Sequence, residues 1–106
     1  GVEIKKISSD NPLLVSKLLA EKGCNKVLWE CGPELATSAV KAGCIQEFIT
    51  FLAPKILGGD SGMTPFSDFN FRSMDEVVNL NLQDIKFLGN DLYLESKYNH
   101  FEKKFN

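Results

Sequence analysis

The residues best placed to do chemistry lie between positions 30 and 38, where a carboxylate is followed by a glycine, a proline and a helical pattern. Glu30 comes directly after the apolar run Val27-Leu28-Trp29, which favours an extended strand. Gly32 permits close approach of a ligand to the backbone, and Pro33 suits the first position of a helix. Because the free amides and dipole of a helix start favour phosphate, this junction predicts an anion site at the carboxyl end of a strand.

The same junction also fits an ordinary turn between a strand and a helix, with Glu30 solvated at the strand end. Neither the dinucleotide pattern G-x-G-x-x-G nor the phosphate-loop pattern ending in Gly-Lys-Ser/Thr occurs in the chain. A nucleotide bound here would therefore lie on neither of these two standard turns.

The three cysteines, Cys24, Cys31 and Cys44, are odd in number and form no C-x-x-C pair. This usage predicts reduced thiols in a cytoplasmic protein. With one histidine, His100, in the whole chain, we expect no metal site. A catalytic thiol at Cys31 is an alternative that lacks an internal histidine to serve it, so no catalytic residue is assigned.

Charge and hydropathy limit the partners of the chain. The 106 residues carry a net charge of −2, and this lack of basic excess argues against a nucleic-acid binder. The longest apolar run, residues 48–53, is too short to cross a bilayer, and the chain opens without a leader-like segment. We therefore expect one cytoplasmic domain that binds neither nucleic acid nor membrane.

Hydrophobic periodicity predicts alternating strands and helices in the first half of the chain. Strands are expected at residues 2–7, 26–30 and 47–53. The last is apolar on both sides and should therefore be central in a sheet or covered on both faces. A helix is expected from Pro12, capped by Asp10 or Asn11 and ended by Gly23, and a second from Pro33 to Gly43. This β-α-β-α-β order predicts an α/β fold with a parallel core.

The second half follows a different pattern. Residues 55–70 are rich in glycine and predict a long loop, pinned to the body by Phe66, Phe69 and Phe71. Residues 74–80 fit no single element. Residues 83–88 and 92–98 flank Gly89-Asn90-Asp91 and predict an antiparallel hairpin, which would make the sheet mixed.

Three sequence blocks, taken together and in order, resemble one known family. They are VLWECGPELA at 27–36, AGCIQE at 42–47 and FLAPKILGG at 51–59. The family is the reductase domain of the bifunctional riboflavin-biosynthesis deaminase/reductases, with a fold like dihydrofolate reductase. The resemblance runs from about Val2 through the hairpin. It implies that residues 1–99 are the C-terminal part of such a domain and that residues 100–106 are a C-terminal tail.

The resemblance implies a reaction and a site. The reaction is reduction of the ribosyl side chain of 5-amino-6-(5-phosphoribosylamino)uracil to ribityl, with a hydride from NADPH. Glu30 corresponds to a substrate-binding residue of the family. The segment that lies against the cofactor phosphates corresponds to Gly32, Pro33, Glu34, Leu35, Ala36, Thr37 and Ser38. A homodimer is also implied, since members of the family are commonly dimeric.

Several features depart from the family pattern. Cys31 stands where glycine or alanine is common, Gln46 replaces an aspartate, and Glu34 adds a negative charge beside the expected phosphate site. The first part of the domain and the zinc signature of a deaminase are missing, so we expect little or no activity from this chain alone. Two alternatives stay open: another dihydrofolate-reductase-like oxidoreductase, and a non-catalytic dimerisation module.

Overall fold

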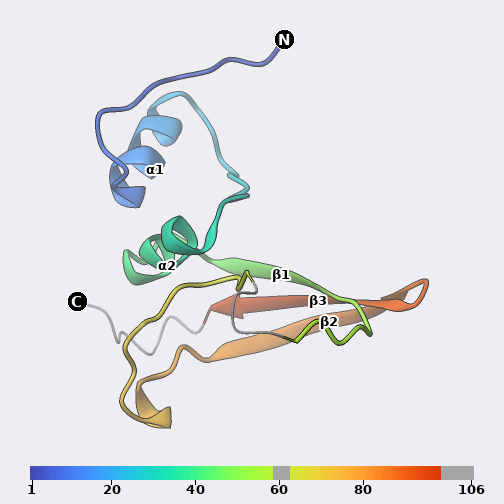
Figure 1. The fold of residues 1–106 in the computed structure, drawn as a ribbon. Coiled ribbons are helices and arrows are strands. Elements are labelled where there is room, and N and C mark those ends of the chain that lie inside the picture. Colours follow the sequence, from blue (N-terminus) through green and yellow to red (C-terminus); the bar gives the residue numbers. More distant parts are fainter. Residues whose placement is uncertain (59–62, 99–106) are drawn as a thin grey trace.

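The computed structural model describes residues 1–58 and 63–98 (Figure 1). In chain order the elements are α1 (Pro12–Glu21), α2 (Pro33–Lys41), β1 (Glu47–Leu52), the 3-10 helix η1 (Met74–Glu76), β2 (Leu80–Leu88) and β3 (Asp91–Tyr98). The three strands form one antiparallel sheet in the order β1-β3-β2. Helix α2 lies between α1 and the sheet, so the amino-terminal residues stand farthest from the strands (Figure 1).

Both helices begin at the predicted prolines, and each ends two residues before its predicted terminating glycine, Gly23 or Gly43. The Asn11 side chain, one of two predicted caps of α1, accepts a hydrogen bond of 3.0 Å from the amide of Leu13. After α1, Gly23 adopts φ +87°, and its amide donates to the carbonyl of Ala20 at 2.9 Å. This left-handed glycine ends the helix because other residues are disfavoured in that conformation. Helix α2 has Pro33 at its first position, as predicted.

The predicted hairpin forms from β2 and β3. Leu88 pairs with Asp91, so the turn consists of the two residues Gly89 and Asn90. Gly89 has φ +62° and Asn90 does not have a positive φ, as in the turn type that requires glycine at its first central position. Strand β2 begins at Leu80, three residues before the predicted start at Gln83. The ambiguous residues 74–80 thus divide between η1 and the start of β2.

The two predicted amino-terminal strands, residues 2–7 and 26–30, do not form in this chain, and the described residues contain no parallel pair. Both segments lack assigned strand structure, and Val2, Ile4 and Leu28 are 92%, 87% and 78% exposed. A strand requires a neighbour to pair with its amides and carbonyls. Because the described part of the chain offers these segments no neighbour, the predicted parallel core does not form among the described residues. What forms is an α/β fold with an antiparallel sheet.

Strand β1 was predicted to be central or covered on both faces, and within the described structure it is neither. It forms at the predicted place but lies at the edge of the sheet, paired with β3 alone among the described strands. Its apolar side chains remain open to solvent, with Phe51 and Leu52 66% and 53% exposed. The continuous apolar run of β1 therefore has no cover within the described structure.

Few side chains of residues 1–58 and 63–98 are buried. Those that are lie on the helices: Pro12 on α1, and Thr37, Ala39 and Val40 on α2. The accessible surface of the chain is 8947 Å², whereas a compact protein of 11.8 kDa exposes roughly 5,900 Å². The excess indicates that this conformation leaves surface uncovered that a complete domain would bury.

Aromatic contacts hold the loop after β1 against that strand, as predicted. The rings of Phe48 and Phe66 lie 6.1 Å apart, those of Phe66 and Phe69 6.0 Å, and those of Phe69 and Phe71 stack at 5.0 Å. Four rings thus connect β1 to the segment that crosses below α2 (Figure 1). Residues 59–62 of the predicted loop and the predicted tail, residues 100–106, lie outside the described residues.

Candidate functional site

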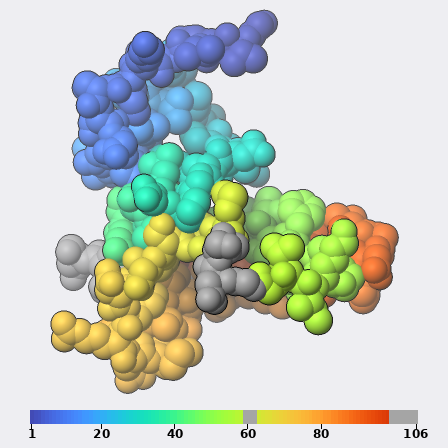
Figure 2. Space-filling view, in the orientation of Figure 1, coloured from blue at the N-terminus to red at the C-terminus, as the bar shows by residue number. Residues whose placement is uncertain are grey.

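A cavity of about 940 Å³ opens between the extended segment that precedes α2 and the start of β1. Figure 2 shows the amino-terminal part, in blue and cyan, standing away from the green and orange sheet region, with α2 joining the two. The lining residues come from five places in the chain. They are Leu13 and Ser16 of α1, residues 25–31, Ala36 and Val40 of α2, residues 43–49, and Pro65 with Phe66.

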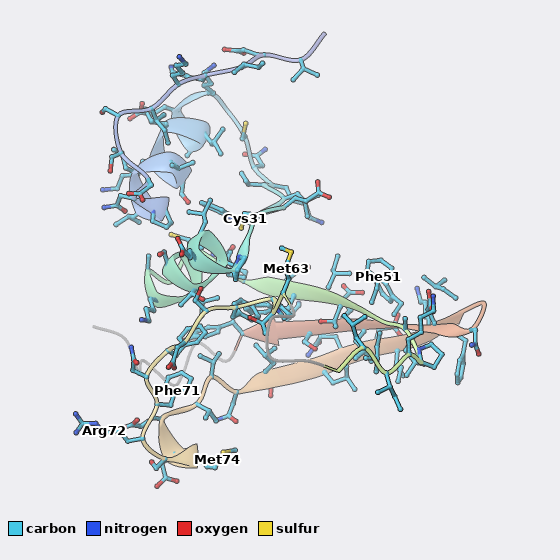
Figure 3. All side chains as sticks on the ribbon, viewed as in Figure 1. Cys31, Phe51, Met63, Phe71, Arg72 and Met74 are labelled. Carbon is cyan, nitrogen blue, oxygen red and sulfur yellow. The ribbon has the colours of Figure 1, made fainter. Side chains whose placement is uncertain are left out.

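Glu30 lies on the wall of this cavity and is exposed. Within the described residues its carboxylate forms neither an ion pair nor a hydrogen bond that would hold it. Cys31 follows at the turn that enters α2 (Figure 3), also exposed and with a free thiol. Glu30 is therefore available to a ligand that reaches the cavity from its open side.

The amino-terminal end of α2 is capped by backbone alone. Gly32 occupies the cap position with φ −73° and ψ 174°, and no side chain accepts from the first turn. Pro33 has no amide hydrogen, and the amide of Ala36 donates to the carbonyl of Gly32 at 3.0 Å. In the described part of the chain, the amides of Glu34 and Leu35 have no acceptor. Two donors therefore point away from the helix start, where an anion is favoured.

Gly32 has room around it. Its φ is one that any residue adopts, so the backbone alone does not require glycine here. A β-carbon at this position would meet nothing within 4 Å. The described chain therefore supplies no packing reason for glycine, and the space beside it can admit a group from outside.

Thr37 and Ser38 differ in whether their side chains are free to bind a ligand. The Thr37 side chain is 5% exposed, and its hydroxyl accepts a hydrogen bond of 2.8 Å from the amide of Ser67. The same amide lies 3.4 Å from the carbonyl of Pro33. Thr37 therefore anchors the loop under α2, whereas Ser38 is exposed. The sequence contained no signal for the partnership of Thr37 with Ser67, which lies thirty residues further on.

The structure thus divides the predicted site into two parts. Glu30 and Ala36 line the cavity, whereas Gly32, Pro33, Glu34, Leu35, Thr37 and Ser38 do not. The free amides of the first turn therefore lie next to the cavity without forming part of its wall. A ligand that used both would have to extend from the α2 start across the mouth of the cavity.

Other features limit the kinds of site that the described residues can form. Residues 1–58 and 63–98 contain no cluster of three or more histidine, cysteine or acidic side chains that could hold a metal ion. Neither helix in this part of the chain is long and apolar enough to cross a membrane. The cavity with its neighbouring helix start remains the candidate site.

Comparison with known proteins places the chain in one group. A family model described as the RibD C-terminal domain matches residues 6–94. Riboflavin biosynthesis protein RibD of Synechocystis is 38% identical over 90 residues, and the chloroplastic riboflavin biosynthesis protein PYRR of Zea mays is 39% identical over 80. Among solved structures, form 2 of RibD from Acinetobacter baumannii superimposes with a TM-score of 0.73 at 26% identity and covers 92% of this chain.

The chain spans only part of these relatives. It covers 24% of the Synechocystis protein, 13% of the maize protein and 26% of the Acinetobacter chain. The likeness of fold and sequence therefore concerns one segment of a longer polypeptide in each relative.

Proposed function

The chain belongs to the RibD C-terminal domain family, and from this premise we propose that it is part of an NADPH-dependent reductase of riboflavin biosynthesis. The proposed reaction reduces the ribosyl side chain of 5-amino-6-(5-phosphoribosylamino)uracil to ribityl. The observation that carries this proposal is the match to the family model over residues 6–94, which includes every residue of the candidate site.

The residues present suit the cofactor and substrate proposed for them. Glu30 is proposed to bind the substrate, because its exposed carboxylate can accept hydrogen bonds from sugar hydroxyls or pyrimidine N–H groups. Residues 32–38 are proposed to bind the cofactor phosphates. The free amides of Glu34 and Leu35 and the open space beside Gly32 support this assignment.

Bound NADPH would supply the hydride, and the protein would supply position and exclusion of water. Glu30 would fix the substrate at the cavity wall, and the first turn of α2 would hold the phosphates. Glu34 works against the second role, since its carboxylate competes for the same amides. We assign no residue of this chain to proton transfer.

A titration with NADPH, followed by amide chemical shifts, tests the cofactor site. We expect saturable shifts at residues 32–38, with NADH titrated in parallel for comparison. We also expect an affinity gain of about twofold to fivefold in Glu34→Gln, equivalent to roughly 0.3–1 kcal/mol. Glu21→Gln, on α1, is the matched control and should leave the affinity unchanged. Shifts confined to other regions, in a folded chain, would remove residues 32–38 from the proposal.

The isolated chain is proposed to have little or no reductase activity. Its cavity is open, and much of its apolar surface is uncovered. NADPH oxidation in the presence of the pyrimidine substrate measures this directly. Turnover by the chain alone would show that the missing part is dispensable, and turnover with other pteridine or pyrimidine substrates would favour a different oxidoreductase.

Three further features belong to the proposal. Residues 2–7 and 26–30 become strands of a parallel core in the longer protein, next to the antiparallel hairpin. Two copies associate as a homodimer, for which the exposed apolar side chains of the hairpin, such as Phe87 at 82% exposure, give a reason. The protein resides in the cytoplasm, which the free thiols of Cys24, Cys31 and Cys44 support.

A further inference from the structure

Helices α1 and α2 begin with the same residue pattern but are held in different ways. Each has a proline at its first position, after Asn11 in α1 and after Gly32 in α2. In α1 the Asn11 side chain accepts a hydrogen bond of 3.0 Å from the amide of the second helical residue, Leu13. In α2 no side chain accepts from an amide of the first turn. Because a side-chain cap is the usual means of holding a first turn, the start of α2 must be held in another way.

The loop that crosses below α2 holds this first turn (Figure 1). The amide of Ser67 donates to the Thr37 hydroxyl at 2.8 Å and to the Pro33 carbonyl at 3.4 Å. The Thr37 hydroxyl in turn donates to the Ser67 carbonyl at 3.5 Å. Pro33 and Thr37 are four residues apart, so they lie on one face of the helix. One backbone amide of the loop therefore joins both ends of the first turn of α2.

This contact is shielded from water and lies within a loop that is itself attached. Thr37 is one of the few buried residues in the part of the chain that the structure describes. The ammonium of Lys41, in the last turn of α2, lies 5.6 Å from the centre of the Phe69 ring. The rings of Phe66 and Phe48 lie 6.1 Å apart and attach the loop to β1. The Ser67 amide is therefore held in place on both sides of its position in the loop.

Holding the turn in this way leaves its amides available. A side-chain cap bonds the amide of the second or third helical residue, which in α2 are Glu34 and Leu35. Ser67 engages a carbonyl and a hydroxyl instead, so in the described structure neither of these amides has an acceptor. Donors that are fixed before binding hold an anion better than donors that binding must first order. Helix α2 thus begins with two fixed and available donors.

We propose that the Thr37 hydroxyl and the Ser67 amide are positioning groups for the phosphate end of the cofactor. They take the place of a side-chain cap, and they hold the first turn of α2 while the amides of Glu34 and Leu35 stay available to phosphate. The Thr37 hydroxyl acts through Ser67 and not by contact with phosphate, since it is buried and already bonded to the Ser67 backbone. The inference rests on the proposed function in one respect: it takes residues 32–38 as the phosphate site.

The glycine at the cap position of α2 fits this proposal. Serine, aspartate and asparagine are favoured at such positions because their side chains bond the first amides. Neither the backbone angles of Gly32 nor the space around it excludes these residues, because its φ is −73° and a β-carbon would meet nothing within 4 Å. A capping side chain would, however, occupy an amide that phosphate requires. Glycine at position 32 therefore keeps the two donors available.

The test titrates the chain with inorganic pyrophosphate and follows amide chemical shifts, so it does not depend on reductase activity. In the parent chain we expect saturable shifts at Glu34 and Leu35. Thr37→Val should weaken the affinity for pyrophosphate by about threefold to tenfold, as expected for the loss of one hydrogen bond. Thr37→Ser keeps the hydroxyl and should retain most of the affinity. Thr50→Val makes the same substitution at an exposed position of β1, and this matched control should bind like the parent chain.

A second variant, Gly32→Ser, separates positioning from stability without altering a buried residue. Serine at this position can cap α2, so amide exchange in the first turn should slow. The affinity for pyrophosphate should nevertheless fall by about threefold or more, because the serine hydroxyl occupies one of the two donors. When Gly32→Ser is combined with Thr37→Val, the first turn should again be protected from exchange, but binding should not recover. A purely structural role of Thr37 predicts recovery of both.

Four results would overturn the proposal. Absence of shifts at Glu34 and Leu35 in the parent chain would mean that the first turn does not bind phosphate. Equal affinity in the parent chain and Thr37→Val would mean that Thr37 does not position these amides. Unchanged or higher affinity in Gly32→Ser, or recovered affinity in the double variant, would mean that the free amides are not the donors. Failure of the reductase assignment is distinct: the pyrophosphate results would hold, but NADPH would cause no shifts beyond those of pyrophosphate.

Discussion

The hairpin of β2 and β3 and the segment of residues 26–30 have similar strand-forming sequences but different structures. Leu92-Tyr93-Leu94 lies in a paired strand, whereas Val27-Leu28-Trp29 is unpaired. The hairpin strands find each other across a turn of two residues, which costs little loop-closure entropy. Residues 26–30 are followed by α2, so their partners must come from distant parts of the sequence. Apolar, β-branched or aromatic composition therefore selects extended backbone, and the availability of a partner decides whether a strand forms.

A second contrast concerns how firmly the two helices are attached to the segments beside them. Helix α2 is tied to the loop at residues 64–71 by Thr37 and Ser67 and by Lys41, whose ammonium lies 5.6 Å from the centre of the Phe69 ring. Lys22, at the carboxyl-terminal cap of α1, forms an exposed ion pair with Glu3 of the extended amino terminus. Exposed pairs of this kind contribute little. The predictions below test the hairpin turn, the attachment of α2, the cap of α1 and the ion pair at the end of α1, in that order.

Gly89→Val should have the largest effect, because it disrupts the turn that joins β2 to β3. Valine at φ +62° is strained by about 2 kcal/mol. We expect the midpoint of denaturant unfolding, followed by strand circular dichroism, to fall accordingly. Asn90→Val is the matched control, since Asn90 does not have a positive φ, and an equal loss in both variants would contradict the role given to Gly89.

Thr37→Val should loosen the attachment of the loop to α2. The change keeps the shape of a buried side chain but removes the acceptor that lies 2.8 Å from the amide of Ser67, at a cost of about 1.5 kcal/mol. The direct measurement is faster exchange of the Ser67 amide. Ser38→Ala, at the exposed neighbouring position, should leave that amide unchanged. If the Ser67 amide stays equally protected from exchange in Thr37→Val, its 3.4 Å hydrogen bond to the Pro33 carbonyl is sufficient to protect it.

Asn11→Ala should act locally on α1. Loss of the side-chain acceptor for the Leu13 amide costs about 1 kcal/mol, and it should appear as fraying of the first helical turn. Amide exchange at Leu13 and Val15 measures this loss, whereas exchange in the hairpin should not change. Asn11→Asp retains an acceptor and should behave like the parent chain. A matching change in the hairpin would show that α1 and the hairpin unfold together.

The smallest effect concerns pH. The hydrogen bond and positive charge of Lys22 lower the pKa of the Glu3 carboxyl below its ordinary value of 4.5. The contribution of the pair is therefore complete above about pH 4.5 and is lost as the pH falls through the lowered pKa. In Lys22→Gln the pKa of Glu3, followed by NMR titration, should return toward 4.5. Lys17→Gln should not change it, and an unshifted Glu3 in the parent chain would rule out the pair in solution.

How far the sequence predicts this structure depends on how far apart in the sequence the interacting residues lie. Asn11, Gly23, Pro33 and Gly89 mark element ends that follow from contacts within a few residues, and all four predictions are confirmed. The sequence predicted β1 to be central or covered on both faces, but β1 lies at the edge of the described sheet, because an apolar run does not determine which strands pair with it. The assignment of Glu30 and residues 32–38 as a ligand site stays a prediction, which the free amides of α2 support.

By itself the sequence determined the family and the local elements. The blocks at residues 27–36, 42–47 and 51–59 carry the family resemblance, and the turn and cap residues set where helices and hairpin begin and end. Only the tertiary structure decided the order β1-β3-β2, the bond between Thr37 and Ser67, and the cavity between residues 25–31 and the start of β1. These depend on which segments meet in space, because backbone pairing and burial are properties of both partners and not of either sequence alone.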